Sequence, residues 1–150
     1  MSLRIPPLAQ FVACALLSWA LTAYFPQLGF AWFGLVYLAA AFMSLGLGIL
    51  TFSVAAFIRA RTTVNPMAPE QANHLVTNGL YRYSRNPMYL GLLCVLLGAA
   101  LYLENLAAFS GAVLFVWLMT VLQIKPEERA LQLKFGEAFA DYRRTTRRWI

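Results

Sequence analysis

Four long runs of apolar residues dominate the pattern of the chain. An α-helix rises 1.5 Å per residue, so about 20 apolar residues cross the roughly 30 Å hydrocarbon core of a bilayer. The pattern predicts an all-α integral membrane protein with about four transmembrane helices, over residues 8–25, 31–58, 88–103 and 106–124. The third run is the shortest, and its length is marginal for a full crossing.

The polar residues lie between these runs and indicate how the predicted helices are connected. Only Glu104 and Asn105 separate the last two runs, which predicts a tight antiparallel hairpin of helices. Residues 59–87 form the main polar loop, and residues 125–150 form a polar C-terminal segment. That segment opens on Lys125-Pro126-Glu127-Glu128, which is typical of a helix start, and the residues that follow predict an amphipathic helix that Gly136 could interrupt.

Charge sets the expected orientation in the membrane. Only 12% of the residues are charged, against about a quarter in soluble domains. There are 12 Lys and Arg residues against 6 Asp and Glu, and with four spans every basic residue lies on the side of the two termini and the polar loop. The positive-inside rule makes that side cytoplasmic, and the basic excess predicts contact with anionic membrane lipid. No binding motif for nucleic acid is present, so we exclude nucleic acid as a partner.

Three features of the apolar runs favour structural roles. The first run is longer than the apolar part of a signal peptide and no A-x-A site follows it, so a membrane span is the favoured interpretation. Cys14 and Cys94 lack the spacing of a metal site, so we expect two small buried side chains and no metal. Ala40, Ser44 and Gly48 share one helix face, where another helix could approach closely, and the oligomeric state stays open.

The stretch 73–91 concentrates the groups that could perform chemistry. It contains the only histidine, two arginines, three tyrosines and the turn-forming pair Asn78-Gly79. One interpretation is an interfacial loop, because tyrosine and arginine are common where a helix meets lipid headgroups. The other interpretation is part of an active site.

The order of the residues resembles the isoprenylcysteine carboxyl methyltransferases, a family of membrane methyltransferases related to the phospholipid N-methyltransferases. The resemblance extends from about residue 73 to residue 142 and rests on the following residues: Leu75-Val76-Thr77, Gly79, Tyr81, Arg85, Pro87, Tyr89, Gly91, Glu127-Glu128, Phe135-Gly136-Glu137 and Tyr142. It implies a helical membrane enzyme that binds S-adenosylmethionine from the cytosol and methylates a lipidic or small hydrophobic acceptor. Arg85-Asn86-Pro87 is the form associated with bacterial relatives, which implies the bacterial inner membrane.

The resemblance also implies roles for individual residues. It assigns cofactor binding to Asn73, His74, Leu75, Val76, Tyr81, Asn86, Pro87, Met88, Tyr89 and Glu127. It assigns catalysis to Arg85, Glu127 and Glu128. A carboxylate at Glu127 would accept charge-assisted hydrogen bonds from the cofactor's ammonium group. Gln123 stands where the family has an arginine that meets the substrate carboxylate, so a prenylcysteine acceptor is disfavoured. The alternatives are a helix-start carboxylate for Glu127 and a snorkelling anchor for Arg85.

Two hypotheses about function follow. The first is a methyltransferase that works by direct in-line transfer, since the chain has no obvious nucleophile. The second is a non-catalytic four-helix scaffold whose loop and basic tail, with Trp149 beside four arginines, bind lipid headgroups or a partner protein. The enzyme requires Glu127 and Tyr89 to face a common cavity, whereas the scaffold does not. A transporter is disfavoured because the spans carry no ionisable residue.

Overall fold

The computed structural model describes residues 5–60 and 74–150, and the regular elements in this part of the chain are helices. The six α-helices are α1 (Pro7–Tyr24), α2 (Leu35–Arg59), α3 (Pro87–Tyr102), α4 (Phe109–Leu118), α5 (Lys125–Phe135) and α6 (Glu137–Thr145). Short 3₁₀ turns cover Pro26–Leu28, Gly79–Arg82 and Leu106–Ala108, and a π-helical stretch covers Met119–Ile124. The predicted all-α fold is confirmed.

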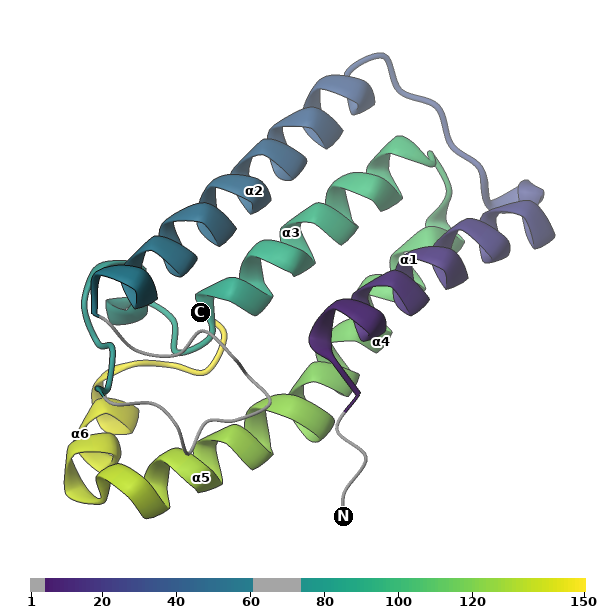
Figure 1. Cartoon of the computed structure of the whole chain (residues 1–150). Coiled ribbons are helices and arrows are strands. Elements are labelled where there is room, and N and C mark those ends of the chain that lie inside the picture. Colours follow the sequence, from purple (N-terminus) through teal and green to yellow (C-terminus); the bar gives the residue numbers. More distant parts are fainter. Residues whose placement is uncertain (1–4, 61–73) are drawn as a thin grey trace.

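Three helical stretches are long and apolar enough to cross a membrane by length and composition: Pro7–Tyr24, Leu35–Arg59 and Leu106–Phe135. The fourth, α3, is apolar but has only 16 residues, or about 24 Å of helix. The four run in alternating directions (Figure 1), so the start of α1, the end of α2 and the start of α3 lie at one end of the bundle. We call it the loop end; α5 and α6 also lie there.

The opposite end of the bundle is closed by two connections that bond to each other. Glu104 takes a positive φ of 48° between α3 and the next helical turn, as the predicted hairpin requires. The side chain of Asn105 accepts a hydrogen bond from the amide of Ala107 at 2.8 Å and donates one to the carbonyl of Phe25 at 2.9 Å. Phe30 donates its amide to the carbonyl of Glu104 at 2.8 Å. The predicted hairpin is confirmed, and it also anchors the connection between α1 and α2.

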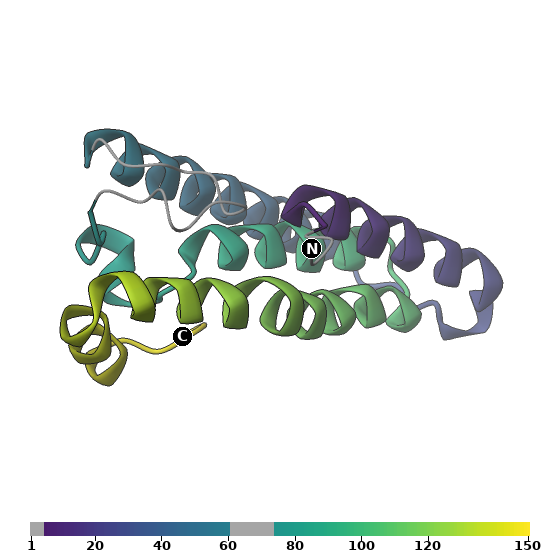
Figure 2. The ribbon, with the colours of Figure 1, turned by 60° about the horizontal axis from the view of Figure 1, so that its bottom comes forward.

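Helix α5 begins at Lys125, as predicted, but it is not separated from the preceding helix, because α4, the π-helical stretch and α5 form one continuous rod (Figure 2). The backbone at Ile124 is helical, and the amide of Lys125 donates to the carbonyl of Thr120, five residues earlier. A proline inside an α-helix has no N–H to donate and clashes with the preceding turn. The wider π-helical turn just before Pro126 gives a physical reason why the helix continues through the proline.

Helices α2 and α3 pack through glycines. A Cβ atom on Gly46 would lie 2.6 Å from the carbonyl oxygen of Gly91, and one on Gly98 would lie 2.9 Å from that of Ala39. These distances leave no room for a side chain. The absence of side chains therefore lets the two backbones approach closely over most of the length of α3.

The small-residue face of α2 does not take part in this contact. Ala40 and Ser44 are exposed, and a Cβ atom on Gly48 would meet nothing within 4 Å. The expectation that another helix could approach closely at this face is therefore not met within the described part of the chain, and the close approach to α3 occurs at Gly46 instead. The face of Ala40, Ser44 and Gly48 stays open in the described part of the chain.

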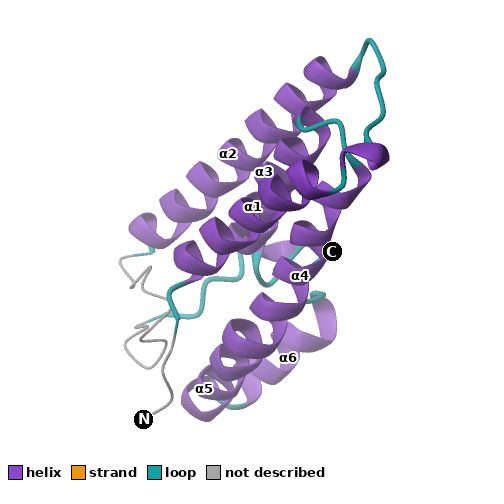
Figure 3. Cartoon of the chain, turned by 90° about the vertical axis from the view of Figure 1, so that its right-hand side faces the viewer, coloured by secondary structure: helices purple, strands orange, loops and turns teal. Residues whose placement is uncertain are grey.

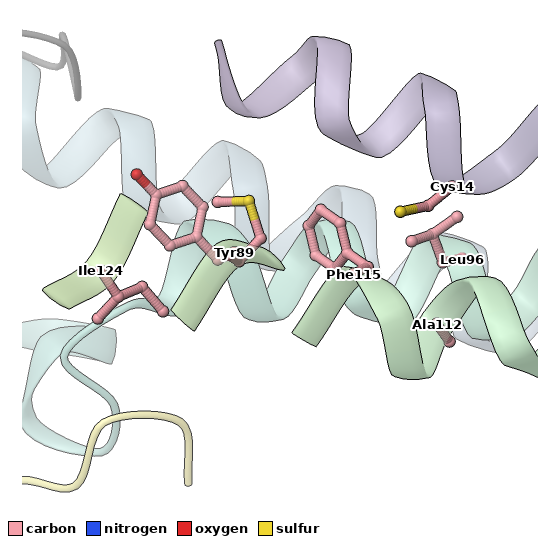
Figure 4. Packing of buried hydrophobic residues seen from close by; sticks show 7 residues of the cluster. Cys14, Tyr89, Leu96, Ala112, Phe115 and Ile124 are labelled. Atoms are coloured by element: carbon pink, nitrogen blue, oxygen red, sulfur yellow. The ribbon is translucent and has the colours of Figure 1, made fainter. Parts of the chain in front are cut away.

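An apolar cluster along α1, α3 and α4 forms the centre of the bundle. Its buried members are Cys14, Tyr89, Leu96, Ala112, Phe115, Met119 and Ile124. In Figure 4 the hydroxyl group of Tyr89 points away from the other labelled members of this cluster. Cys14 and Cys94 are both buried and not paired with each other in a disulfide, as expected for small hydrophobic residues.

Gly136 separates α5 from α6 with φ 52° and ψ −123°, a conformation that strongly favours glycine. The predicted interruption of the C-terminal helix at this residue is confirmed. Figure 3 shows α6 beside α5 at the loop end. Phe139 and Tyr142 bury their side chains on the inner face of α6, which holds it against the rest of the protein.

Candidate functional site

A hydrogen-bonded polar cluster lies at the loop end of the apolar core. The hydroxyl of Tyr89, near the start of α3, donates to Oε1 of Glu127 on α5 at 2.6 Å. Nε2 of Gln123, in the π-helical stretch, donates to the same oxygen at 2.9 Å. Tyr89 and Gln123 are 6% and 2% exposed, whereas Glu127 is half-buried. The predicted pair Glu127 and Tyr89 is therefore in direct contact, and a carboxylate is held at the edge of an apolar core.

Tyr81 lies next to this cluster. Its ring meets the ring of Phe57 edge to face at 5.3 Å between centroids, and its carbonyl accepts a 2.6 Å hydrogen bond from the hydroxyl of Tyr142. Burial, and then the neighbouring Tyr142 and Glu127, raise the pKa of Tyr81. Burial also raises the pKa of Tyr142, partly offset by Arg85. Both phenols therefore stay neutral and keep their hydrogen for donation at physiological pH.

A second cluster joins Arg85, Glu128 and Arg148. Nη2 of Arg85 lies 2.8 Å from Oε1 of Glu128, and Nη2 of Arg148 lies 2.7 Å from Oε2. The side chains of Arg85 and Glu128 are each only 10% exposed. Arg85 also donates to the carbonyl oxygens of Thr146 and Arg143. The hydrogen bond to Glu128 raises the pKa of Arg148.

Glu127 and Glu128 thus serve different clusters, although they are adjacent in the chain. Successive residues of a helix point about 100° apart, so neighbouring carboxylates face different surroundings. Glu127 is directed to the polar cluster with Tyr89, and Glu128 is directed to the two arginines. Of the three residues expected to be catalytic, Arg85 and Glu128 are bonded to each other and to the C-terminal residues.

The residues 146–149, which we call the C-terminal strap, fold back onto the start of α3. The amide of Arg85 donates to the carbonyl of Arg147 at 2.9 Å, and Nδ2 of Asn86 donates to the carbonyl of Arg148 at 2.9 Å. The indole of Trp149 packs against the apolar core and donates to Oγ1 of Thr120 at 3.1 Å. The strap therefore connects the loop, α3 and the π-helical stretch.

Sequence reasoning did not predict these contacts. Three residues of the strap make these contacts: Thr146, Arg148 and Trp149. Outside the strap, Ser84 donates to the carbonyl of Arg148, and Thr120 accepts from Trp149. The signal in the sequence is a tryptophan at the end of a basic segment, which predicts contact with anionic lipid headgroups. Arg143, Arg144 and Arg147 are exposed, as that interpretation expects, but Arg148 is engaged with Glu128.

The other expected cofactor residues have varied surroundings. Val76 and Pro87 are buried, Leu75, Asn86 and Met88 are half-buried, and His74 is exposed. Asn73 lies outside the described residues. Two cavities at the loop end, of about 620 and 550 Å³, are lined by other residues of the described chain, among them Arg82. The clustering of Tyr81, Tyr89 and Glu127 is thus the main geometric feature that the resemblance anticipated.

Comparison with known proteins adds the family. The sequence model of the family described as phospholipid methyltransferase matches residues 34–138, which is more than half of the chain. The chain belongs to the phospholipid methyltransferase family. The matched region of this family member contains Tyr89, Gln123 and Glu127, whereas α1 and the C-terminal strap lie outside it. The resemblance to membrane methyltransferases seen in the sequence is confirmed.

Three curated relatives show the range of the similarity. A rice protein (Oryza sativa subsp. indica) named "Probable protein-S-isoprenylcysteine O-methyltransferase" is 30% identical over 118 residues, which is 79% of this chain and 61% of the relative. The Schizosaccharomyces pombe "Protein-S-isoprenylcysteine O-methyltransferase" is 34% identical over 70 residues, which is 47% of this chain and 30% of the relative. An "Uncharacterized protein" of Haemophilus influenzae is 40% identical over 63 residues, which is 42% of this chain and 100% of the relative.

The chain spans less than two thirds of the length of the rice and fission-yeast methyltransferases. No solved structure matches it significantly.

Proposed function

We propose that this protein is an S-adenosylmethionine-dependent membrane methyltransferase that acts on a lipidic or small hydrophobic acceptor. The observation that carries the proposal is the hydrogen-bonded cluster of Tyr89, Gln123 and Glu127 at the loop end of the bundle. Membership of the phospholipid methyltransferase family supports it, as do relatives named as methyltransferases. A scaffold that only binds lipid has no need of a carboxylate held by two side chains at the edge of its core.

The residues present fit the charged groups of S-adenosylmethionine. The cofactor carries an ammonium and a sulfonium cation, and Glu127 offers a half-buried carboxylate to the first. The rings of Tyr81 and Tyr89 lie beside that carboxylate, where a cation–π contact of about 0.5–2 kcal/mol is available to the second. Leu75 and Met88, which are half-buried, would supply apolar contacts for the adenine.

The protein's part in the reaction is positioning. When bound, the cofactor supplies an electrophilic methyl group, which an acceptor lone pair takes as the carbon–sulfur bond breaks and sulfur keeps the electron pair. Gln123 and Tyr89 hold the Glu127 carboxylate in one orientation, which directs the cofactor's charged end. Holding two reactants in line is worth about 7–11 kcal/mol in favourable cases. The apolar core beside the cluster keeps water away from the reacting atoms.

The acceptor is expected to enter through the lipid. Tyr89 lies on the apolar helix α3, whereas Glu127 lies on α5, which is rich in charged residues. We therefore place the loop end near one membrane surface. Gln123 is bonded to Glu127 and carries no charge, so it gives no counter-charge to an acceptor carboxylate. We therefore propose an uncharged nucleophile, such as a neutral amine, as the acceptor. We place both termini and the loop end at the cytoplasmic face of a bacterial inner membrane.

Titration calorimetry with S-adenosylhomocysteine, the product form of the cofactor, tests this proposal in detergent-purified protein. We expect saturable binding at one site per chain. Glu127→Gln should weaken it by about 10- to 100-fold, the range for a hydrogen bond to a charged group. Glu104→Gln, the same change at an exposed residue of the opposite end, should leave the affinity unchanged. Unchanged affinity in Glu127→Gln would remove the assignment, and absence of binding in folded wild-type protein would favour the scaffold.

A further inference from the structure

A cavity of about 620 Å³ opens at the loop end, between the last turns of α2 and the segment 78–83. It is separate from the polar cluster around Glu127. Tyr81 turns its ring to Phe57 and is buried, whereas its neighbours Leu80 and Arg82 line the cavity. The proposed methyl-transfer site therefore does not account for this cavity.

The lining of the cavity changes from apolar to basic along α2. Phe52, Ala56 and Arg59 follow one another at helical spacing on the cavity side of the helix, and Arg59 belongs to its last turn. Arg82 and Tyr83 line the cavity from the other side. The described lining residues include these two arginines and no carboxylate. Phe52 and Tyr83 are 69% and 78% exposed, so a large aromatic surface lies open beside the positive charge.

The open face of α2 continues the apolar part of the cavity toward the middle of the bundle. Gly48 lies four residues before Phe52, and Ser44 lies four residues before Gly48, so they form one row along the helix. A side chain on Gly48 would meet nothing within 4 Å, and Ser44 is exposed. This row of small side chains starts next to the cavity and runs along the part of α2 that is apolar enough to cross a membrane.

We propose that this cavity and the row of small side chains on α2 bind one anionic glycerophospholipid of the leaflet at the loop end. Arg59 and Arg82 hold the phosphate, and an acyl chain lies along Phe52, Ala56 and Gly48. The two guanidinium groups match the charge of a phosphate, and the surface beside them along α2 is apolar. A soluble anion uses only the basic part of the cavity, and a zwitterionic lipid adds an ammonium group that the two arginines repel.

Native mass spectrometry of the delipidated, detergent-solubilised protein tests the proposal with phosphatidylglycerol as the probe. We expect one tightly retained lipid per chain. The double variant Arg59→Gln, Arg82→Gln should bind it about 25-fold more weakly, at about fivefold for each guanidinium. Arg143→Gln removes an exposed arginine that does not line the cavity and should have no effect. A Cβ atom at Gly48 would meet nothing within 4 Å, so Gly48→Leu places a bulky side chain on the row where the acyl chain would lie and should also weaken retention.

Two further probes separate the possible occupants. Phosphatidylcholine should be retained more weakly than phosphatidylglycerol, and glycerol phosphate, which has no acyl chain, should not compete at equal concentration. Equal retention of both lipids, wild-type affinity in the double variant, or competition by glycerol phosphate would each overturn the proposal. The helical signal in circular dichroism checks that each variant is folded. Because the readout is lipid retention, the result does not depend on methyltransferase activity.

Discussion

Replacing Glu128 by glutamine removes the anion that two guanidinium groups share. Glu128 accepts four N–H contacts of 2.7–3.3 Å from Arg85 and Arg148, and it is 8% exposed. Removing one partner of a buried ion pair costs about 3–5 kcal/mol. Arg148 is one-third exposed and can turn to water, and Arg85 keeps the carbonyl oxygens of Arg143 and Thr146 as acceptors. We therefore expect the lower end of that range, about 3 kcal/mol of lost stability.

This loss of stability is measured by unfolding the detergent-solubilised protein with sodium dodecyl sulfate. The helical signal in circular dichroism reports the folded fraction. Asp141→Asn is the matched control, because its ion pair with Arg144 is exposed and pairs of that kind contribute about 0–1 kcal/mol. Hydrogen exchange should also rise in the C-terminal strap of Glu128→Gln, because Arg148 loses its anchor. Equal stability of the two variants, or an unchanged exchange rate in the strap, would refute the structural role given to this cluster.

Three further predictions follow from packing and burial. Gly46→Ala should destabilise the protein by about 1–3 kcal/mol, because the added methyl group overpacks the contact with α3. Gly48→Ala has space for the methyl group and should be neutral or stabilising by up to about 1 kcal/mol. The same unfolding assay compares the two variants. Trp149→Phe loses the hydrogen bond to Thr120 and the part of the indole packing that a phenyl ring does not replace, so it should cost at least about 1 kcal/mol in that assay. Because the pKa values of Tyr81 and Tyr142 are raised in the folded protein, unfolding frees phenols that ionise near pH 10. Stability should therefore fall as the pH rises above about 10, and a flat profile from pH 9 to 11 in circular dichroism would contradict this.

Much of the fold could be predicted because the membrane imposes simple rules. The predicted spans 8–25 and 88–103 agree with α1 and α3 to within one residue at each end, and the break at Glu104 and Asn105 is a helical hairpin. Apolar runs that must satisfy their own backbone hydrogen bonds in lipid form helices. The number of residues in each run then sets its length, so little tertiary information is needed.

The candidate site was predicted only in part, because local signals there compete with tertiary contacts. Pro126 followed by two glutamates is typical of a helix start, but the π-helical turn before it lets the rod continue. Successive residues of the helix point about 100° apart, so Glu127 meets Tyr89 and Glu128 meets Arg85. The strap was not predictable from periodicity, since its contacts with the start of α3 join residues about 60 positions apart.

Transfer of a labelled methyl group tests the central claim most directly. Membranes that contain the wild-type protein or Glu127→Gln are incubated with S-adenosylmethionine carrying a labelled methyl group, and the organic-solvent extract is analysed for label. The account predicts label in a hydrophobic product with the wild-type protein and much less with Glu127→Gln. Equal label in the two samples, or none above protein-free membranes, would contradict the methyltransferase assignment and the role of the cluster around Glu127.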